Sequence, residues 1–88
     1  MPKKNESKEH VPVEVAIHLD LWGRAIEIQR KFQKITHTNL GLRLGVSQPT
    51  VSRMEKGDPS VAVGTYLSAM YALSLQPELI PFPQVSSR

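Results

Sequence analysis

The sequence contains no cysteine, and no run of apolar residues in it approaches the ~20 needed to span a membrane as a helix. Without cysteine, neither a disulfide framework nor a thiolate metal site is possible. The polar start, MPKKNESKEH, lacks the apolar centre of a signal peptide. We therefore expect a soluble, cytoplasmic protein. Its 88 residues make one domain with a small core, which oligomerisation would help to stabilise.

Acidic residues are scarce in the middle of the chain. Residues 24–56 contain seven lysines and arginines against two acids, whereas each flank carries a net charge of −1. A solvated charged face explains any one of these residues but not their sorting onto a single stretch. This distribution is expected if that stretch faces phosphate groups.

The same stretch, THTNLGLRLGVSQPTVSRMEKG (residues 36–57), predicts two short helices around one turn. Thr36 is an N-cap residue type, and Leu40 and Leu44 follow on one helical face. Gly45 suits the left-handed position that ends a helix, after which Val46 can fold back onto the apolar face.

A second helix is predicted to begin at the N-cap residue Ser47. Pro49 falls in its first turn, where a missing N–H costs nothing, and Val51 and Met54 point inward. The polar outer face and rim comprise Gln48, Pro49, Thr50, Ser52, Arg53 and Lys56. An apolar helix, a short turn with glycine and a second helix with a polar outer face form the helix-turn-helix of DNA-binding proteins.

This stretch resembles the lambda-repressor-like, or Xre-type, helix-turn-helix family, whose usual line is close to TQxxLAxxxGVSxxTISRxExG. The matching residues are Thr36, Leu40, Gly45, Val46, Ser47, Thr50, Ser52, Arg53, Glu55 and Gly57. His37 stands where the family usually has a phosphate-contacting Gln, and Gly41 replaces a helix-favouring Ala. The glycine should weaken the helix by ~1 kcal/mol unless something compensates.

The N-terminal flank is less regular. Residues 1–10 read as a disordered arm. Residues 11–19, VPVEVAIHL, alternate apolar and other residues, which suggests an extended or strand-like segment, although Val15, Leu19, Trp22 and Ile26 also fit a helix. His10, Glu14 and His18 could be drawn as metal ligands, but surface residues at even spacing are common and no further ligand is evident. We expect no metal and no cofactor.

Further helices are predicted on either side of the motif. Asp20 is a plausible N-cap for a helix to about Gln33, with Trp22, Ile26 and either Phe32 or Gln29 on its buried edge. After the turn Asp58-Pro59-Ser60, one helical face is formed by Val63, Leu67, Met70 and Ser74, flanked by Tyr66 and Leu73. Leu79, Ile80 and Phe82 are too many apolar groups for a free tail, and Pro77 could open one more helical turn.

The expected fold is therefore all-α, a compact bundle of four to five short helices with a helix-turn-helix and a possible short N-terminal strand. The helix-turn-helix domain should span residues 20–80, followed by a tail at 81–88.

The second helix of the motif fits a major groove ~12 Å wide, with its first residues at the base edges. Gln48 has the amide that suits adenine, Arg53 has the fork that suits guanine, and Pro49 and Thr50 offer apolar contact to a thymine methyl. The alternatives are a capping or solvent-facing Gln48 and a phosphate-only Arg53. No metal is needed for this reading.

The family resemblance implies further roles. It makes Ser47, Ser52, Arg43 and Lys56 phosphate contacts, with His37 in the position of another. It pairs Arg30 with Glu55 as a structural ion pair, and it places a two-fold dimer interface around Leu79, Ile80 and Phe82. A symmetric dimer would read an inverted-repeat operator on double-stranded DNA.

The phrase KGDPSVAVGTYLSAMYALSL resembles one branch of this family, the HipB-like antitoxins encoded beside HipA-like kinases. That resemblance implies a repressor of its own operon that restrains a kinase toxin. The alternatives are a stand-alone regulator and a protein-interaction module of the same fold that has lost DNA binding. An enzyme is the least favoured class, because three scattered histidines and no evident pocket leave a serine without base or oxyanion site.

Overall fold

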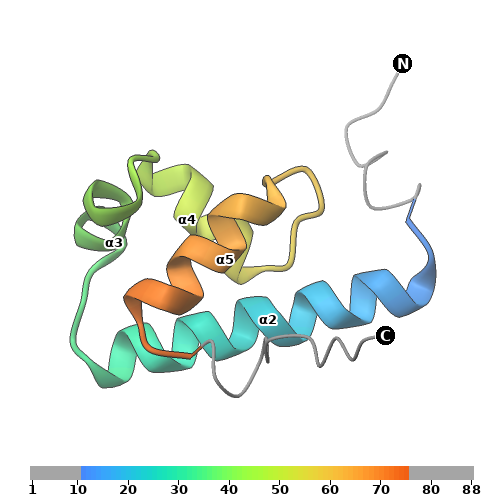
Figure 1. Ribbon diagram of the computed structural model, residues 1–88, viewed down its shortest axis with the longest axis horizontal. Helices are drawn as coiled ribbons and strands as arrows, with labels where there is room; N and C mark the ends of the chain where they lie inside the picture. Colours follow the sequence, from blue (N-terminus) through green and yellow to red (C-terminus); the bar gives the residue numbers. More distant parts are fainter. Residues whose placement is uncertain (1–10, 76–88) are drawn as a thin grey trace, which may run out of the picture.

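The structure, a computed structural model, describes residues 11–75. In that range the chain forms four helices and no strand. They are α2 (Val13–Phe32), α3 (His37–Leu44), α4 (Gln48–Glu55) and α5 (Val63–Ala72). The predicted all-α bundle is confirmed. Figure 1 shows α3, α4 and α5 gathered on the same side of the long α2 helix. Residues 1–10 and 76–88, with the proposed interface residues Leu79, Ile80 and Phe82, lie outside the described range.

The start of α2 corrects the extended conformation predicted for residues 11–19. The chain is helical from Val13, and the Ala16 N–H donates to the Pro12 carbonyl at 3.0 Å. A helix satisfies its own backbone groups, whereas a strand needs a partner, and no strand exists among residues 11–75. Asp20, predicted as an N-cap, lies inside α2 instead, so the folded domain begins before residue 20.

The buried edge of α2 is formed by residues that face the other three helices. Ile26 is fully buried and Trp22 is half-buried, as predicted. Of the two alternatives for the last turn, Gln29 is correct, because its side-chain amide donates to the Leu73 carbonyl at 3.4 Å. Phe32 is wrong, since it is 78% exposed.

The core lies where α2, α3, α4 and α5 meet. Its largest fully buried side chains are Ile26, Leu40, Val51, Met54, Tyr66, Met70 and Leu73. Each such side chain contributes roughly 1.5 to 3 kcal/mol relative to an exposed one. Of the inward positions predicted for the motif, Leu40, Val51 and Met54 are therefore core positions, and Leu44 is partly buried against the core.

The buried face of α5 is rotated from the predicted one. Tyr66, Met70 and Leu73 face the core, but Val63 is 61% exposed. Ser74, placed on the same face, lies beyond the end of the helix with a φ of 64°. The helix ends at Ala72, so the periodicity that included Ser74 extended two residues too far.

Two glycines allow helices to approach closely. A Cβ at Gly23 would lie 2.6 Å from the Met54 carbonyl oxygen, and a Cβ at Gly41 would lie 2.7 Å from the Val46 carbonyl oxygen. Both neighbours are backbone atoms and cannot turn away. The helix-weakening glycine at position 41 is thus compensated by the tight turn packed against it.

Candidate nucleic-acid interface

The first half of the motif has the caps that its sequence predicts. The Asn39 N–H donates to the Thr36 Oγ1 at 3.0 Å, which satisfies one of the free donors at the start of α3. Gly45 closes α3 with a φ of 73°, and the Val46 N–H donates to the Gly41 carbonyl at 2.9 Å. Val46 then packs against the core. Thr36 and Gly45 therefore fix both ends of α3.

The second half begins in the same way. The Thr50 N–H donates to Ser47 Oγ at 3.3 Å, and Pro49 occupies the first turn of α4. Val51 and Met54 are fully buried. Since these two residues anchor the inner face, the opposite face of α4 is directed to solvent.

The structure brings most predicted DNA-contacting residues together on α4. Four side chains on this helix or at its end are exposed, namely Gln48, Pro49, Arg53 and Lys56. Thr50 and Ser52 are half-buried. Ser47, before α4, and Arg43, in the last turn of α3, are also exposed. We call the exposed face formed by Gln48, Pro49, Arg53 and Lys56 the α4 outer face.

Two of the predicted base contacts, Thr50 and Arg53, have partners inside the protein. Thr50 Oγ1 lies 2.9 Å from Ser47 Oγ, so the two hydroxyl groups share a hydrogen bond. Arg53 Nε lies 3.5 Å from Asp58 Oδ2, with half of the arginine side chain exposed. The weak contact with Asp58 orients the guanidinium, and base or phosphate binding would compete with it.

The predicted ion pair between Arg30 and Glu55 is present and buried. Arg30 Nε donates to Glu55 Oε2 at 2.6 Å, and Nη2 donates to Oε1 at 3.2 Å. Nη1 donates to the Ile35 carbonyl at 2.8 Å. The arginine and glutamate side chains are only 9% and 5% exposed. This two-pronged pair joins α2, the loop before α3 and the end of α4.

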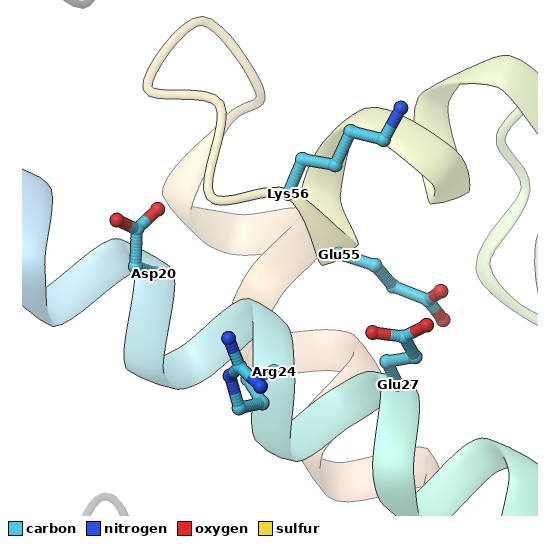
Figure 2. Close-up of a pocket in the computed structure, with 5 residues that line it drawn as sticks. All are labelled: Asp20, Arg24, Glu27, Glu55 and Lys56. Atoms are coloured by element: carbon cyan, nitrogen blue, oxygen red, sulfur yellow. The ribbon is translucent and has the colours of Figure 1, made fainter.

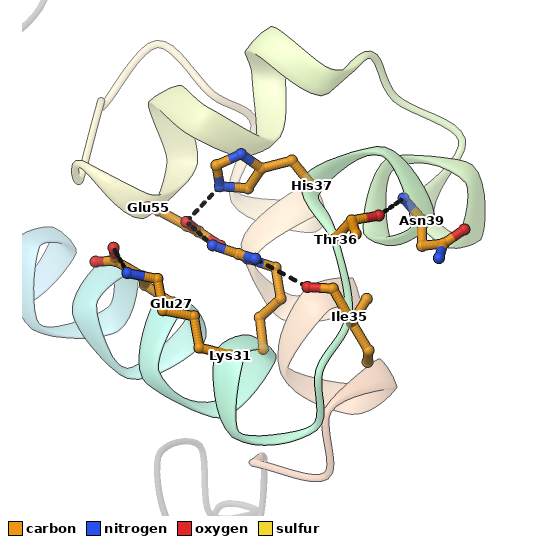
Figure 3. Close-up of polar contacts among 8 residues, drawn as sticks. Glu27, Lys31, Ile35, Thr36, His37, Asn39 and Glu55 are labelled. Carbon is orange, nitrogen blue, oxygen red and sulfur yellow. Dashed lines mark hydrogen bonds and ion pairs between the residues drawn. The ribbon is translucent and has the colours of Figure 1, made fainter.

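His37 has a partner that the sequence did not suggest. Its Nε2 lies 2.9 Å from Glu55 Oε1, and its side chain is 30% exposed (Figure 3). The histidine therefore extends the buried ion pair toward the surface. A phosphate contact from His37 would need its Nδ1 or would break this bond.

A hollow of about 380 Å³ lies between α2 and the end of α4. It is lined by Asp20, Arg24, Glu27, Glu55 and Lys56, which Figure 2 draws. The lining mixes both signs of charge, and the Glu55 carboxylate is already held by Arg30 and His37. At the rim, Lys31 pairs with Glu27 at 3.1 Å, which lowers the pKa of that carboxyl group.

Within residues 11–75, no three histidines or carboxylates lie where they could hold a metal ion together. His10 lies outside the described range, and His18 Nδ1 lies 3.2 Å from the Glu14 carbonyl oxygen. None of the described helices is both long and apolar enough to cross a bilayer.

The structure adds one surface feature that sequence reasoning missed. The exposed side of α2 carries five large apolar residues, Val13, Ile17, Leu21, Ile28 and Phe32. Their spacing of four, four, seven and four was the available signal, but the first three were assigned to other elements or left unassigned.

Comparison with known proteins gives no relative: no family model, curated protein or solved structure matches the chain significantly.

Proposed function

We propose that this protein is a sequence-specific DNA-binding repressor of transcription that presents α4 to the major groove. The observation that carries the proposal is the α3–turn–α4 unit. Both helices are capped by side chains, the turn contains a left-handed glycine, and the α4 outer face is polar, cationic and exposed. An α-helix held in this way fits the width of a B-DNA major groove.

The charges of the motif support the same proposal. Arg30 and Lys31 are neutralised by Glu55 and Glu27. The exposed cations of the motif are Arg43, Arg53 and Lys56, on α3, α4 and the turn after α4. Neutralising phosphates with such cations releases counterions, so affinity should fall steeply with salt.

The proposal assigns roles by side-chain chemistry. Gln48, Pro49, Thr50 and Arg53 are base contacts, and Ser47, Ser52, Arg43, Lys56 and His37 are phosphate contacts that set the register. The protein acts as a homodimer on an inverted repeat in the cytoplasm. It requires no cofactor and catalyses no reaction.

The decisive experiment is a fluorescence anisotropy titration of the protein onto its own upstream DNA and a shuffled duplex at two salt concentrations. A preference of ~10³ or more for its own sequence is expected, with steep salt dependence. Equal, weak binding to both duplexes would refute the proposal and favour an interaction module that has lost DNA binding.

Single substitutions distinguish base contacts from phosphate contacts. Arg53→Ala should cost ~1 to 3 kcal/mol and relax the preference at one base pair. Lys56→Ala should weaken all sequences alike and reduce the salt slope by about one. Lys31→Ala is the matched control, because it removes the same charge from α2 rather than from the turn after α4. If the control lowered affinity as much as Lys56→Ala, the effect would be general electrostatics rather than a contact.

The sharper part of the proposal is an antitoxin that represses its own operon and restrains a HipA-like kinase. It is supported by the resemblance of residues 56–75 to HipB-like antitoxins. The test is the neighbouring gene: a HipA-like kinase whose product forms a stable complex with this protein on co-expression is expected. If the neighbour were unrelated, a stand-alone regulator would be the remaining reading.

A further inference from the structure

The long helix α2 has a second apolar face that none of the described helices covers. Its members are Val13, Ile17, Leu21, Ile28 and Phe32, between 53% and 78% exposed. At 100° per residue these five side chains fall within about 100° of arc. Ile26 and Arg30, which are buried, lie on the opposite side of the helix. We call the five exposed residues the outer stripe.

Among the described helices, α3, α4 and α5 all lie away from the outer stripe. In Figure 1, α3, α4 and α5 lie along the same side of α2. The buried residues of α2 are Gly23, Ile26 and Arg30. Large exposed apolar side chains gathered on one face of a helix mark an interaction surface.

We propose that the outer stripe is the interface between two copies of this chain, with the two α2 helices packed antiparallel. The stripe has the symmetry that this pairing needs. If the helices cross midway between Leu21 and Arg24, Val13 lies level with Phe32 of the second copy, and Ile17 lies level with Ile28. Ile17 of each copy then faces Ile28 of the other across the two-fold axis, as an isologous interface requires, while Val13 and Phe32 extend the contact at its two edges.

The charges of α2 also favour the antiparallel arrangement. The half of α2 before Gly23 carries Glu14 and Asp20, and the half after it carries Arg24, Glu27 and Lys31 outside the core, with Arg30 buried against Glu55. A parallel pair would place like charges and like ends of the helix dipoles together. The antiparallel pair instead brings the acidic half of each helix beside the basic half of the other, and does so twice.

The area reaches the lower end of the range for a specific dimer. Each outer-stripe side chain exposes roughly 100 Å² of surface, so complete burial of all five in two copies would remove roughly 1,000 Å² from solvent. Specific interfaces begin at about this size, and flanking polar contacts add to it. Leu21 packs against the stem of Arg24 from the second copy at the centre, where hot-spot residues usually lie.

This interface does not rest on the proposed DNA binding, because it concerns only how two chains associate. It also differs from the interface that the family resemblance implies around Leu79, Ile80 and Phe82. Since the two interfaces use different residues, substitutions distinguish them.

The first test measures mass by sedimentation equilibrium without DNA. The wild-type protein is expected to be a dimer, and Ile28→Asp should raise its dissociation constant at least 100-fold. Leu42→Asp is the matched control, because Leu42 is an exposed leucine of α3. Circular dichroism should show both variants folded, since both positions are exposed. An Ile28→Asp protein that stayed as dimeric as the control would overturn the proposal.

The second test uses the absence of native cysteine to read the register. Ile17→Cys and Ile28→Cys proteins are mixed and oxidised. In the antiparallel pair, positions 17 and 28 of different copies are level, whereas identical positions are about 16 Å apart along the axis at 1.5 Å per residue. The mixture should therefore cross-link between the two variants, and neither variant should cross-link to itself.

The other outcomes each contradict the proposal. Self-linking of either variant alone would indicate a parallel pair. No cross-link in the mixture would mean that another surface forms the dimer or that another segment of the same chain covers the stripe. Loss of DNA binding in a protein that still cross-links would instead refute the proposed function and leave this interface standing.

Discussion

Replacement of Glu55 by alanine tests whether the buried ion pair holds the three elements together. The substitution removes both hydrogen bonds from Arg30 and the contact with His37. Arg30 then keeps only the Ile35 carbonyl as a partner for a guanidinium that is 9% exposed. Removing one member of a buried pair costs about 3 to 5 kcal/mol, because the remaining charge is buried without compensation.

That cost is large relative to the stability of the protein. A chain of this size has a free energy of unfolding of roughly 4 to 13 kcal/mol. Urea denaturation followed by circular dichroism should show the Glu55→Ala midpoint falling by one or more molar, at an m-value of about 1 to 2 kcal/mol/M. Glu55→Gln keeps the shape and one acceptor, so it gives a measurable transition even if the alanine variant does not fold.

Glu27→Ala is the control for a general effect of losing a carboxylate. Glu27 pairs with Lys31 on the surface of α2, where such a pair contributes ~0.3 to 0.5 kcal/mol. The double variant Arg30→Met with Glu55→Met removes both charges and should recover most of the loss. A change of only a few tenths for Glu55→Ala would refute the argument that the pair is desolvated and structural.

Three further perturbations follow from local geometry. Gly57→Ala should lower the free energy of unfolding, measured by urea denaturation, by ~2 to 4 kcal/mol. The reason is that φ at this position is 79° and the new Cβ would lie 2.9 Å from the Asp20 Cα. A loss under ~1 kcal/mol would contradict this. Gly64→Ala should stabilise the protein by up to ~1 kcal/mol and so raise its thermal midpoint, since Gly64 is helical and a Cβ there would have no neighbour within 4 Å. A lower midpoint would show an unrecognised contact. Burial, aided by the charges of Asp58 and Asp20, raises the pKa of Tyr66. The stability that comes from keeping the Tyr66 hydroxyl protonated in the folded protein is complete below pH ~10, the ordinary tyrosine pKa. Above that pH, the free energy of unfolding should fall by up to ~1.4 kcal/mol per pH unit. Urea midpoints between pH 8 and 11 should show a shallower alkaline loss for Tyr66→Phe, and an identical slope would be inconsistent with the buried hydroxyl.

The parts of the fold that sequence predicted correctly depend on local chemistry. Thr36 and Ser47 cap their helices, and Gly45 takes the left-handed conformation, because each residue acts on backbone groups within a few positions. The inner positions Leu40 and Val51 follow from helical periodicity in the same way. Such signals need no knowledge of the rest of the chain.

The errors arise where a stretch of sequence fits both strand and helix periodicity, or where a contact with a distant element determines the structure. Over nine residues, the alternation of VPVEVAIHL and a helical spacing are both satisfied, and α2 begins without a side-chain cap that would have distinguished them. The bond from His37 to Glu55 and the tight contact at Gly41 depend on tertiary packing, so no local pattern announces them. Among the candidate site residues, sequence predicted which lie on the outer side of α4 but not the Asp58 contact of Arg53.

Arg30 and Ser47 act on opposite ends of α4. Ser47 fixes the first turn of the helix, and Arg30 holds Glu55 in its last turn while also gripping the Ile35 carbonyl. The orientation of α4 is thereby set during folding, before anything binds to it. A partner meets a preorganised helix and pays no ordering entropy for it. Weakening the hydrogen bonds of Arg30 should therefore leave the association rate of a complex formed by α4 unchanged and increase its dissociation rate.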